Sequence, residues 1–337
     1  MTENNSLDVL VWKEQLSRFK ALAKKYGLAM IMLTMNNYVT VIALIFAAAI
    51  AGAIIGADFF AEGTDLSYWS SMILNELAAY VVPILMLRAI FKNECRSFIP
   101  DRTYKPIPLE ALLLFMGGMT AGALGSIITE AINTVVDSLF GTGEIEDVFT
   151  GMEPANIGQY VIFAFCICVV APIAEEYIFR DLLLKPLRAF GDLTAAVVSG
   201  VIFGLYHGNF DQFAYASVLG FFYSVIAIKY NSIIPTIICH AANNTLVTTS
   251  NYLSYAIENE SEQVKTICTT LSDICGIGAT LMMLGGILGL VVVIVKKCLS
   301  LHNHNPYVPE PRALIDFISV PWVIVGTVVM LAVFFIQ

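Results

Sequence analysis

Long stretches with no charged residue, or almost none, recur along the whole chain. They fall at about residues 36–57, 66–87, 111–129, 154–174, 193–210, 212–228, 230–252, 277–295 and 317–336. A run of roughly twenty apolar residues is long enough to cross the hydrocarbon core of a bilayer as a helix. The chain is 58% hydrophobic and only 13% charged, which excludes an ordinary soluble domain. We predict an all-α, polytopic transmembrane helical bundle with about 8–9 spans.

Basic and acidic residues fall on alternate loops of this predicted bundle. With a cytoplasmic N-terminus, every Lys and Arg except Lys265 lies on the cytoplasmic side, while the outer loops hold acidic residues such as Asp58, Glu144 and Glu262. This distribution follows the positive-inside rule, so we predict a cytoplasmic N-terminus. The net charge of -9 comes largely from the outer loops and gives no sign of nucleic-acid binding. We therefore expect the lipid bilayer as a partner and no nucleic acid.

The pattern divides the chain into four parts. Residues 1–30 form a basic, amphipathic cytoplasmic segment, which is either a helix on the inner leaflet or an ordinary capping helix. Residues 31–152 contain the N-terminal transmembrane helices. Residues 153–252 form a core that holds most of the membrane-embedded polar groups, and residues 253–337 form an outer loop and C-terminal transmembrane helices.

Small residues and cysteines give weaker evidence about helix packing and disulfide bonding. The stretches "MGGMTAGALGS" and "GIGATLMMLGGILGL" place glycines and alanines at spacings that let helices approach closely, so we predict helix packing at both. Cys268 and Cys275 lie near the predicted outer face, where they either form a disulfide or stay as two free thiols.

Four places carry ionisable groups at membrane depth, where such groups are costly and usually face a cavity or one another. They are Glu76; Glu175 and Glu176 with Arg180; His207; and His240 with Asn243 and Asn244. Each place is a candidate for function. For Glu76, in the second predicted helix, a side chain that simply reaches the outer interface is the simpler alternative.

The stretch "AEEYIFR", residues 174–180, closes one of the uncharged runs. Residues four apart share a helical face, so Glu176 and Arg180 are predicted to pair. Glu175 points about 100° away and lacks that cation, which leaves a desolvated carboxylate suited to proton transfer. The alternative is a capping cluster at a helix end beside the lipid headgroups.

The two histidines follow helical spacings of their own. Phe203 and His207 share a face in "FGLYHG", and His240 and Asn244 share one in "HAANN". A buried histidine and asparagine each need a hydrogen-bond partner, which favours a site over simple packing. Counting residues puts Glu175 and His240 about 14 Å from the cytoplasmic surface but His207 about 22 Å from it. The helix of His207 must therefore tilt or start deeper for the three groups to meet.

One glutamate, two histidines and one asparagine are sufficient for peptide hydrolysis, which needs a base for water, an oxyanion stabiliser and an acid for the leaving amine. Glu175, a histidine and Asn244 can fill these roles. The same set could instead hold zinc through Glu175, His207 and His240, with an open position for water. A helical HExxH motif is absent, so the spacing does not specify a metal.

Three motifs in this order carry a family resemblance: EExxxR at Glu175, Glu176 and Arg180; FxxxH at Phe203 and His207; and HxxxN at His240 and Asn244. They resemble the CPBP family (CAAX protease and bacteriocin-processing, also called Abi) of intramembrane endopeptidases. The resemblance covers roughly residues 155–250. Three motifs in order are specific, whereas each alone is weak.

The resemblance implies a multi-pass membrane protease, in a bacterial cell membrane, that cleaves a membrane-associated peptide or protein. It implies that Glu175 activates water with help from His207, and that His240 and Asn244 form the oxyanion site. Glu176, Arg180 and Phe203 would then be supporting residues. Both metal-dependent and metal-free mechanisms are described for the family; we favour the metal-free one, with zinc as the alternative.

Two other function classes stay open. A non-catalytic immunity or scaffold protein would use the same cavity only for binding. A proton-coupled transporter would use Glu76 and Glu175 as a relay, although the sequence lacks the paired discontinuous helices typical of transporters.

Overall fold

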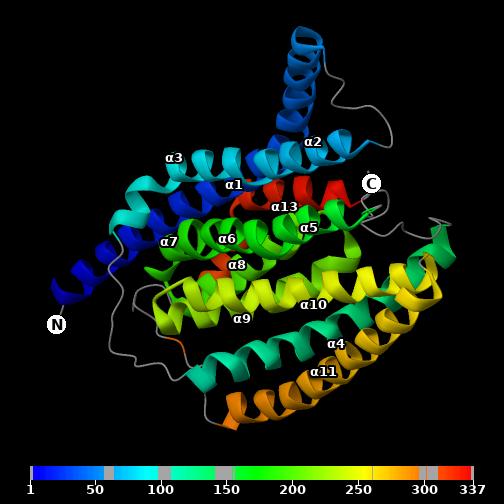
Figure 1. Ribbon diagram of the computed structural model, residues 1–337. Helices are drawn as coiled ribbons and strands as arrows, with labels where there is room; N and C mark the ends of the chain where they lie inside the picture. Colours follow the sequence, from blue (N-terminus) through cyan, green and yellow to red (C-terminus); the bar gives the residue numbers. More distant parts are fainter. Residues whose placement is uncertain are drawn as a thin grey trace.

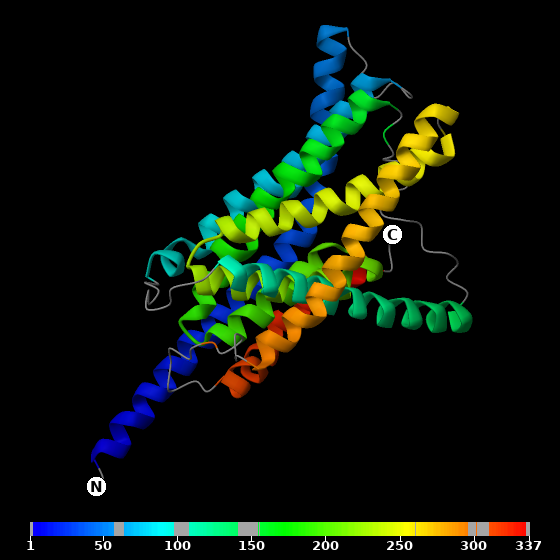
Figure 2. The same ribbon diagram turned by 60° about the horizontal axis from the view of Figure 1, so that its bottom comes forward.

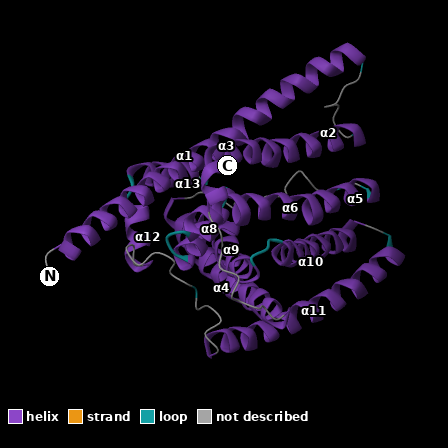
Figure 3. Ribbon diagram, turned by 90° about the vertical axis from the view of Figure 1, so that its left-hand side faces the viewer, coloured by secondary structure: helices purple, strands orange, loops and turns teal. Residues whose placement is uncertain are grey.

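Helices make up every regular element in the described part of the chain (Figures 1 and 3). The structure is a computed structural model that describes residues 3–56, 64–97, 108–140, 154, 156–259, 261–295, 301 and 310–334. Long rods lie against one another, with α1 at one edge of the bundle and α11 at the opposite edge (Figure 1). The predicted all-α transmembrane bundle is confirmed.

The helices in chain order are α1 (Glu3–Ile55), α2 (Asp65–Glu76), α3 (Val82–Ser97), α4 (Pro108–Phe140), α5 (Ile157–Phe165), α6 (Ala171–Glu176), α7 (Leu184–Arg188), α8 (Asp192–Tyr206), α9 (Phe210–Tyr230), α10 (Ile234–Asn259), α11 (Glu262–Val295), α12 (Glu310–Ile318) and α13 (Pro321–Val333). Three π-helical segments, η1 (Leu77–Val81), η2 (Cys166–Val170) and η3 (Tyr177–Leu183), follow α2, α5 and α6 without a break. They widen two rods that face the centre of the bundle.

The predicted number of spans is wrong. Six described helical rods are long and apolar enough to cross a membrane, or seven if the bent pair α12 and α13 counts as one span. That pair bends by 69°. Of the other two uncharged runs, α8 has only 15 residues and is mostly buried in protein, and α10 carries a polar face. An uncharged run therefore does not by itself distinguish contact with lipid from burial in the bundle.

Glycines set the closest helix crossings. A Cβ on Gly27 of α1 would lie 2.1 Å from the carbonyl oxygen of Trp322 in α13. A Cβ on Gly286 of α11 would lie 2.4 Å from the carbonyl oxygen of Met116 in α4. Both distances are shorter than any real contact, so only glycine allows these backbones to approach. The packing predicted for the two small-residue stretches is confirmed, since α4 and α11 cross at these residues (Figure 2).

The hairpin of α8 and α9 forms the centre of the bundle. Asp192 starts α8 at a buried position and accepts a hydrogen bond from Arg188 Nε at 2.8 Å. The preceding Gly191 has φ +139°, a conformation that favours glycine. Asn209 caps α9 by accepting from the backbone N–H of Gln212, and Asn231 ends that helix in the left-handed region. These residues determine where the two helices of the hairpin begin and end, and so keep α8 short and buried.

Helix α1 runs without a break across residue 30, where we predict a boundary. Phe19 and Ala23 are completely buried, and the Phe19 ring lies 4.8 Å from that of Phe190. This part of the amphipathic face packs on protein. At the predicted cytoplasmic ends, Lys229 pairs with Glu110 at 3.1 Å and Lys25 pairs with Glu94.

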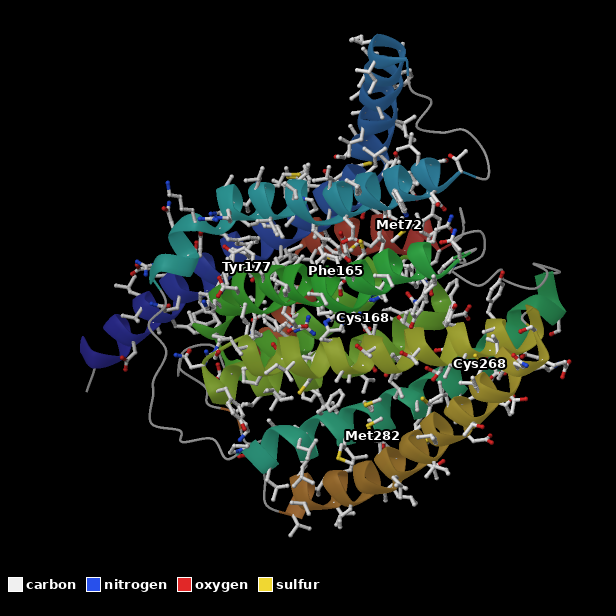
Figure 4. The ribbon with its side chains drawn as sticks, in the orientation of Figure 1. Met72, Phe165, Cys168, Tyr177, Cys268 and Met282 are labelled. Atoms are coloured by element: carbon white, nitrogen blue, oxygen red, sulfur yellow. The ribbon has the colours of Figure 1, made fainter. Side chains whose placement is uncertain are left out.

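Cys268 and Cys275 are both free, so the disulfide alternative is excluded. Cys268 is buried at the start of α11, against Leu253 and Ala256 of α10 (Figure 4). At the opposite side of the bundle, Met72 of α2 packs with Phe163 and joins the rods α2–α3 and α5–α7.

Candidate active site

A fully buried ion pair forms the base of the site. Glu176 ends α6 and Arg180 lies in η3, one turn later, with Arg180 Nη1 at 3.2 Å from Glu176 Oε1. Arg180 also donates from Nη2 to the carbonyl oxygen of Gly220 at 3.2 Å. Its guanidinium lies 4.5 Å from the ring centre of Phe203 and 5.3 Å from that of Tyr223. The predicted pair is present, and aromatic faces shield it from lipid and water.

His240 of α10 contacts both glutamates. Its Nδ1 lies 3.0 Å from Glu176 Oε1, and its Nε2 lies 3.7 Å from Glu175 Oε2. Because an ionised carboxylate only accepts, Nδ1–H donates to Glu176, which fixes the ring with Nε2 toward Glu175. The Tyr223 ring lies 5.3 Å away on one side, and Phe203 meets the imidazole edge-on at 5.7 Å.

The two carboxylate oxygens of Glu175 differ in their hydrogen bonding. Oε1 accepts a hydrogen bond of 2.8 Å from the hydroxyl of Tyr80 in η1. Oε2 is fully buried and has no hydrogen-bond partner within the described residues. The distance of 3.7 Å from Oε2 to His240 Nε2 is longer than a hydrogen bond, so these two atoms do not satisfy each other.

His207 packs against the Phe203 ring. It caps the C-terminus of α8, its Nδ1 lies 2.8 Å from the carbonyl oxygen of Phe203, and its ring meets Phe203 at 4.8 Å. His207 interacts electrostatically with Glu175 and His240. It also lines a cavity of about 320 Å³ between α1, α8 and α13.

Asn244 lies one turn after His240 on α10. Its Nδ2 donates to the carbonyl oxygen of Ile167 in η2 at 2.9 Å. Its side-chain oxygen accepts from Nδ2 of Asn243 at 3.2 Å, and Tyr215 donates to Asn243 at 2.5 Å. The asparagine amide is therefore held in one orientation, with one Nδ2 proton left over.

Sequence reasoning missed two aromatic residues of the site, Tyr80 and Tyr223. Tyrosines are common in apolar helices and carry no charge at neutral pH, so neither stands out. The available signal for Tyr80 is its position four residues after Glu76. Glu76 itself interacts electrostatically with Glu175, and its buried Oε2 has no described hydrogen-bond partner. The structure thus brings Glu76 to the edge of the site.

The residues considered for zinc do not form a metal site in this arrangement. In the described ranges, no group of three or more His, Cys, Asp and Glu side chains converges closely enough to hold a metal ion. The Phe203 ring contacts both the His207 and the His240 imidazole. We therefore derive no step through a metal.

Comparison with known proteins finds a family match and a relative. Residues 157–246 match the family described as type II CAAX prenyl endopeptidase Rce1-like. The chain is 27% identical over 207 residues to the "Putative membrane peptidase YdiL" of Bacillus subtilis (strain 168), which covers 59% of this chain and 78% of that protein. No solved structure is significantly similar to the chain. The matched segment contains Glu175, Glu176, Arg180, Phe203, His207, His240 and Asn244.

Proposed function

This chain belongs to the CPBP family of membrane endopeptidases, and we propose that it hydrolyses a peptide bond in a membrane-associated protein or peptide. It is an integral, multi-pass membrane protein. The observation that supports the proposal best is the buried Glu175 carboxylate. One of its oxygens accepts no hydrogen bond from the described residues and lies 3.7 Å from His240 Nε2. The bacterial relative is consistent with a location in a bacterial cell membrane.

Glu175 acts as the general base. Its Oε2 accepts a proton from a water molecule that attacks the scissile carbonyl carbon, and His207 helps to hold that water. The protonated Glu175 then gives this proton to the amine nitrogen, which leaves as the C–N bond breaks. A base must lie within hydrogen-bond reach of the proton it removes, and an oxygen without another partner meets this condition. Burial also keeps bulk water from competing for the carboxylate.

His240 and Asn244 stabilise the oxyanion of the tetrahedral intermediate. In its doubly protonated form, His240 donates from Nδ1 to Glu176 and from Nε2 into the site. The remaining Nδ2 proton of Asn244 supplies a second donor. Donors fixed in advance reorganise little during the reaction, which makes them effective in a site of low dielectric. Glu176 and Arg180 hold His240, and Phe203 packs against both imidazoles.

Cells that carry wild type or Glu175→Gln test the proposal. The amide keeps the volume of the side chain but removes its basicity. We expect cleavage to fall by about 10²- to 10⁴-fold, the usual contribution of a general base. The measurement is a quantitative comparison of new N-terminal peptides released from membrane proteins, followed by assay of the purified protein in proteoliposomes.

Glu130→Gln is the matched control, because Glu130 is exposed on α4 and distant from the site in sequence. It should cleave at the wild-type rate. Wild-type cleavage by Glu175→Gln would overturn the role of Glu175. A wild-type protein that binds peptides in proteoliposomes but cleaves none would favour the non-catalytic immunity or scaffold alternative.

A further inference from the structure

Glu175 receives its one described hydrogen bond from outside the family-matched segment. The donor is the hydroxyl of Tyr80, and the distance to Glu175 Oε1 is 2.8 Å. Tyr80 lies in η1, between α2 and α3, whereas the family match begins at residue 157. A helix of the N-terminal half therefore contacts the carboxylate that we propose as the base.

The backbone that carries Tyr80 is itself held on two sides. Asn36 of α1 donates from Nδ2 to the carbonyl oxygen of Ala78 at 2.9 Å. Tyr206 of α8, the neighbour of His207, donates to the carbonyl oxygen of Ala79 at 2.6 Å. These two bonds use carbonyl groups of the π-helical turn and connect it to both α1 and α8. The position of Tyr80 is thus coupled to the end of α8 that carries His207.

The π-helical geometry of η1 is informative in itself. A π-helical turn inserted in an α-helix is rare and frequently occurs at functional sites. In this chain the wide turn follows Glu76 directly and contains Tyr80. The two side chains interact electrostatically with each other and with Glu175. The carboxyl groups of Glu76 and Glu175 and the hydroxyl of Tyr80 therefore lie close together inside the bundle. Such polar groups are costly there and are not needed for apolar packing, which favours a functional role.

We propose that Tyr80 is a positioning residue for Glu175. The inference rests on the function proposed above and adds a component from the N-terminal helices. By donating to Oε1, Tyr80 fixes the rotation of the carboxylate, so that Oε2 stays directed at the gap beside His240 Nε2. Without the hydroxyl, the carboxylate turns about its last torsion angle and its basic oxygen leaves the reactive orientation. Substrate binding does not involve this hydrogen bond.

Tyr80→Phe is the direct test, because it removes only the hydroxyl oxygen. We expect kcat to fall by about 10- to 100-fold, as is typical when a reacting group is misplaced by a small distance, while KM stays near the wild-type value. In a Glu175→Asp background, the same substitution should have little further effect, since residues that act as one unit are not additive.

Tyr26→Phe is the matched control. Tyr26 is completely buried and its hydroxyl donates to a backbone carbonyl oxygen, that of Leu183, rather than to a site carboxylate. Its loss should lower thermal stability but leave kcat of the folded protein unchanged. If both variants lose activity only in proportion to the folded fraction, Tyr80 is structural and the proposal is wrong.

A second readout does not depend on activity. A membrane-permeant carbodiimide should modify Glu175 faster in Tyr80→Phe than in wild type or in Tyr26→Phe, because the carboxylate has lost its donor. Equal labelling in all three proteins would overturn the positioning role. A third outcome is that wild type cleaves no substrate but Glu175 is still labelled faster in Tyr80→Phe than in wild type. The proposed function would then be wrong, while the role of Tyr80 in orienting Glu175 would be supported.

Discussion

Helices α8 and α11 are both apolar, yet they are used in opposite ways. In α8, 11 of 15 residues are buried, and these include Asp192, Thr194 and Ser199. In α11, only 4 of 34 residues are buried, and two of these are glycines. The central helix encloses polar groups that must find partners inside the protein, whereas the peripheral helix presents apolar side chains outward and needs only close contact with α4. Polar burial, more than hydrophobicity, marks the functional half of the bundle.

This difference predicts how much stability a substitution costs in each region. Around α8, a substitution exposes buried charges or unsatisfied polar groups to a medium that cannot solvate them. Around α11, the apolar side chains face lipid, which is as apolar as they are. A substitution there therefore changes only helix packing or one weak hydrogen bond. Variants in the two regions should therefore differ strongly in cost.

The largest effect is expected from Arg180→Gln, which leaves the fully buried Glu176 without its cation. Breaking one partner of a buried ion pair costs about 3–5 kcal/mol. The measurement is thermal unfolding in detergent together with the yield of folded protein. Arg18→Gln is the control, since the Arg18–Glu14 pair is largely exposed, and it should unfold like wild type. Equal stability of the two variants would contradict the comparison.

A smaller effect is expected from Gly200→Ala in α8. The added Cβ would lie 2.7 Å from the backbone nitrogen of Phe221 and 2.8 Å from the carbonyl oxygen of Ser217. Both are backbone atoms of α9, so the helices must separate, at a cost of about 1–3 kcal/mol. Gly278→Ala in α11 has no atom within 4 Å of the new Cβ and serves as control. Thermal unfolding should detect the first change and not the second.

The smallest effect is expected from Thr120→Val, at the contact between α4 and α11. Thr120 donates to the carbonyl oxygen of Met283 at 3.3 Å. Hydrogen bonds between membrane helices contribute about 0.6 kcal/mol on average, so stability should fall only slightly. Thr134→Val, whose hydroxyl bonds within its own helix, controls for the change of residue type. A loss as large as that of Arg180→Gln would show that α11 belongs to the central unit.

Local spacing was sufficient to predict part of the site. The i, i+4 rule predicts the Glu176–Arg180 pair, and the structure has it at 3.2 Å. The depth estimate requires the helix of His207 to tilt or start deeper. This stays a prediction, because Asp192 at the start of α8 is buried by protein, which does not report its depth in a bilayer. The family resemblance is also confirmed, over a segment close to the one that the motifs suggest.

Other features could not be predicted, because they depend on which helices meet. The periodicity of α2 and α3 does not predict that η1, the turn between them, packs against α6. The contact of Tyr80 with Glu175 therefore cannot be predicted from the sequence. The π-helical turns shift the faces of two rods relative to ideal α-helical counting. The span count is wrong for a related reason: a run without charges looks the same whether lipid or protein surrounds it.

The contacts around Glu175 also have a consequence for synthesis of the protein. Asn36, Tyr80, Glu175 and His240 come from helices that span most of the chain, so on the proposed mechanism no nascent fragment that ends before α10 contains a working centre. The ribosome must have translated that helix, and the membrane must have received it, before the carboxylate and imidazole can meet. On the proposed function, cleavage therefore cannot begin before α10 has entered the membrane.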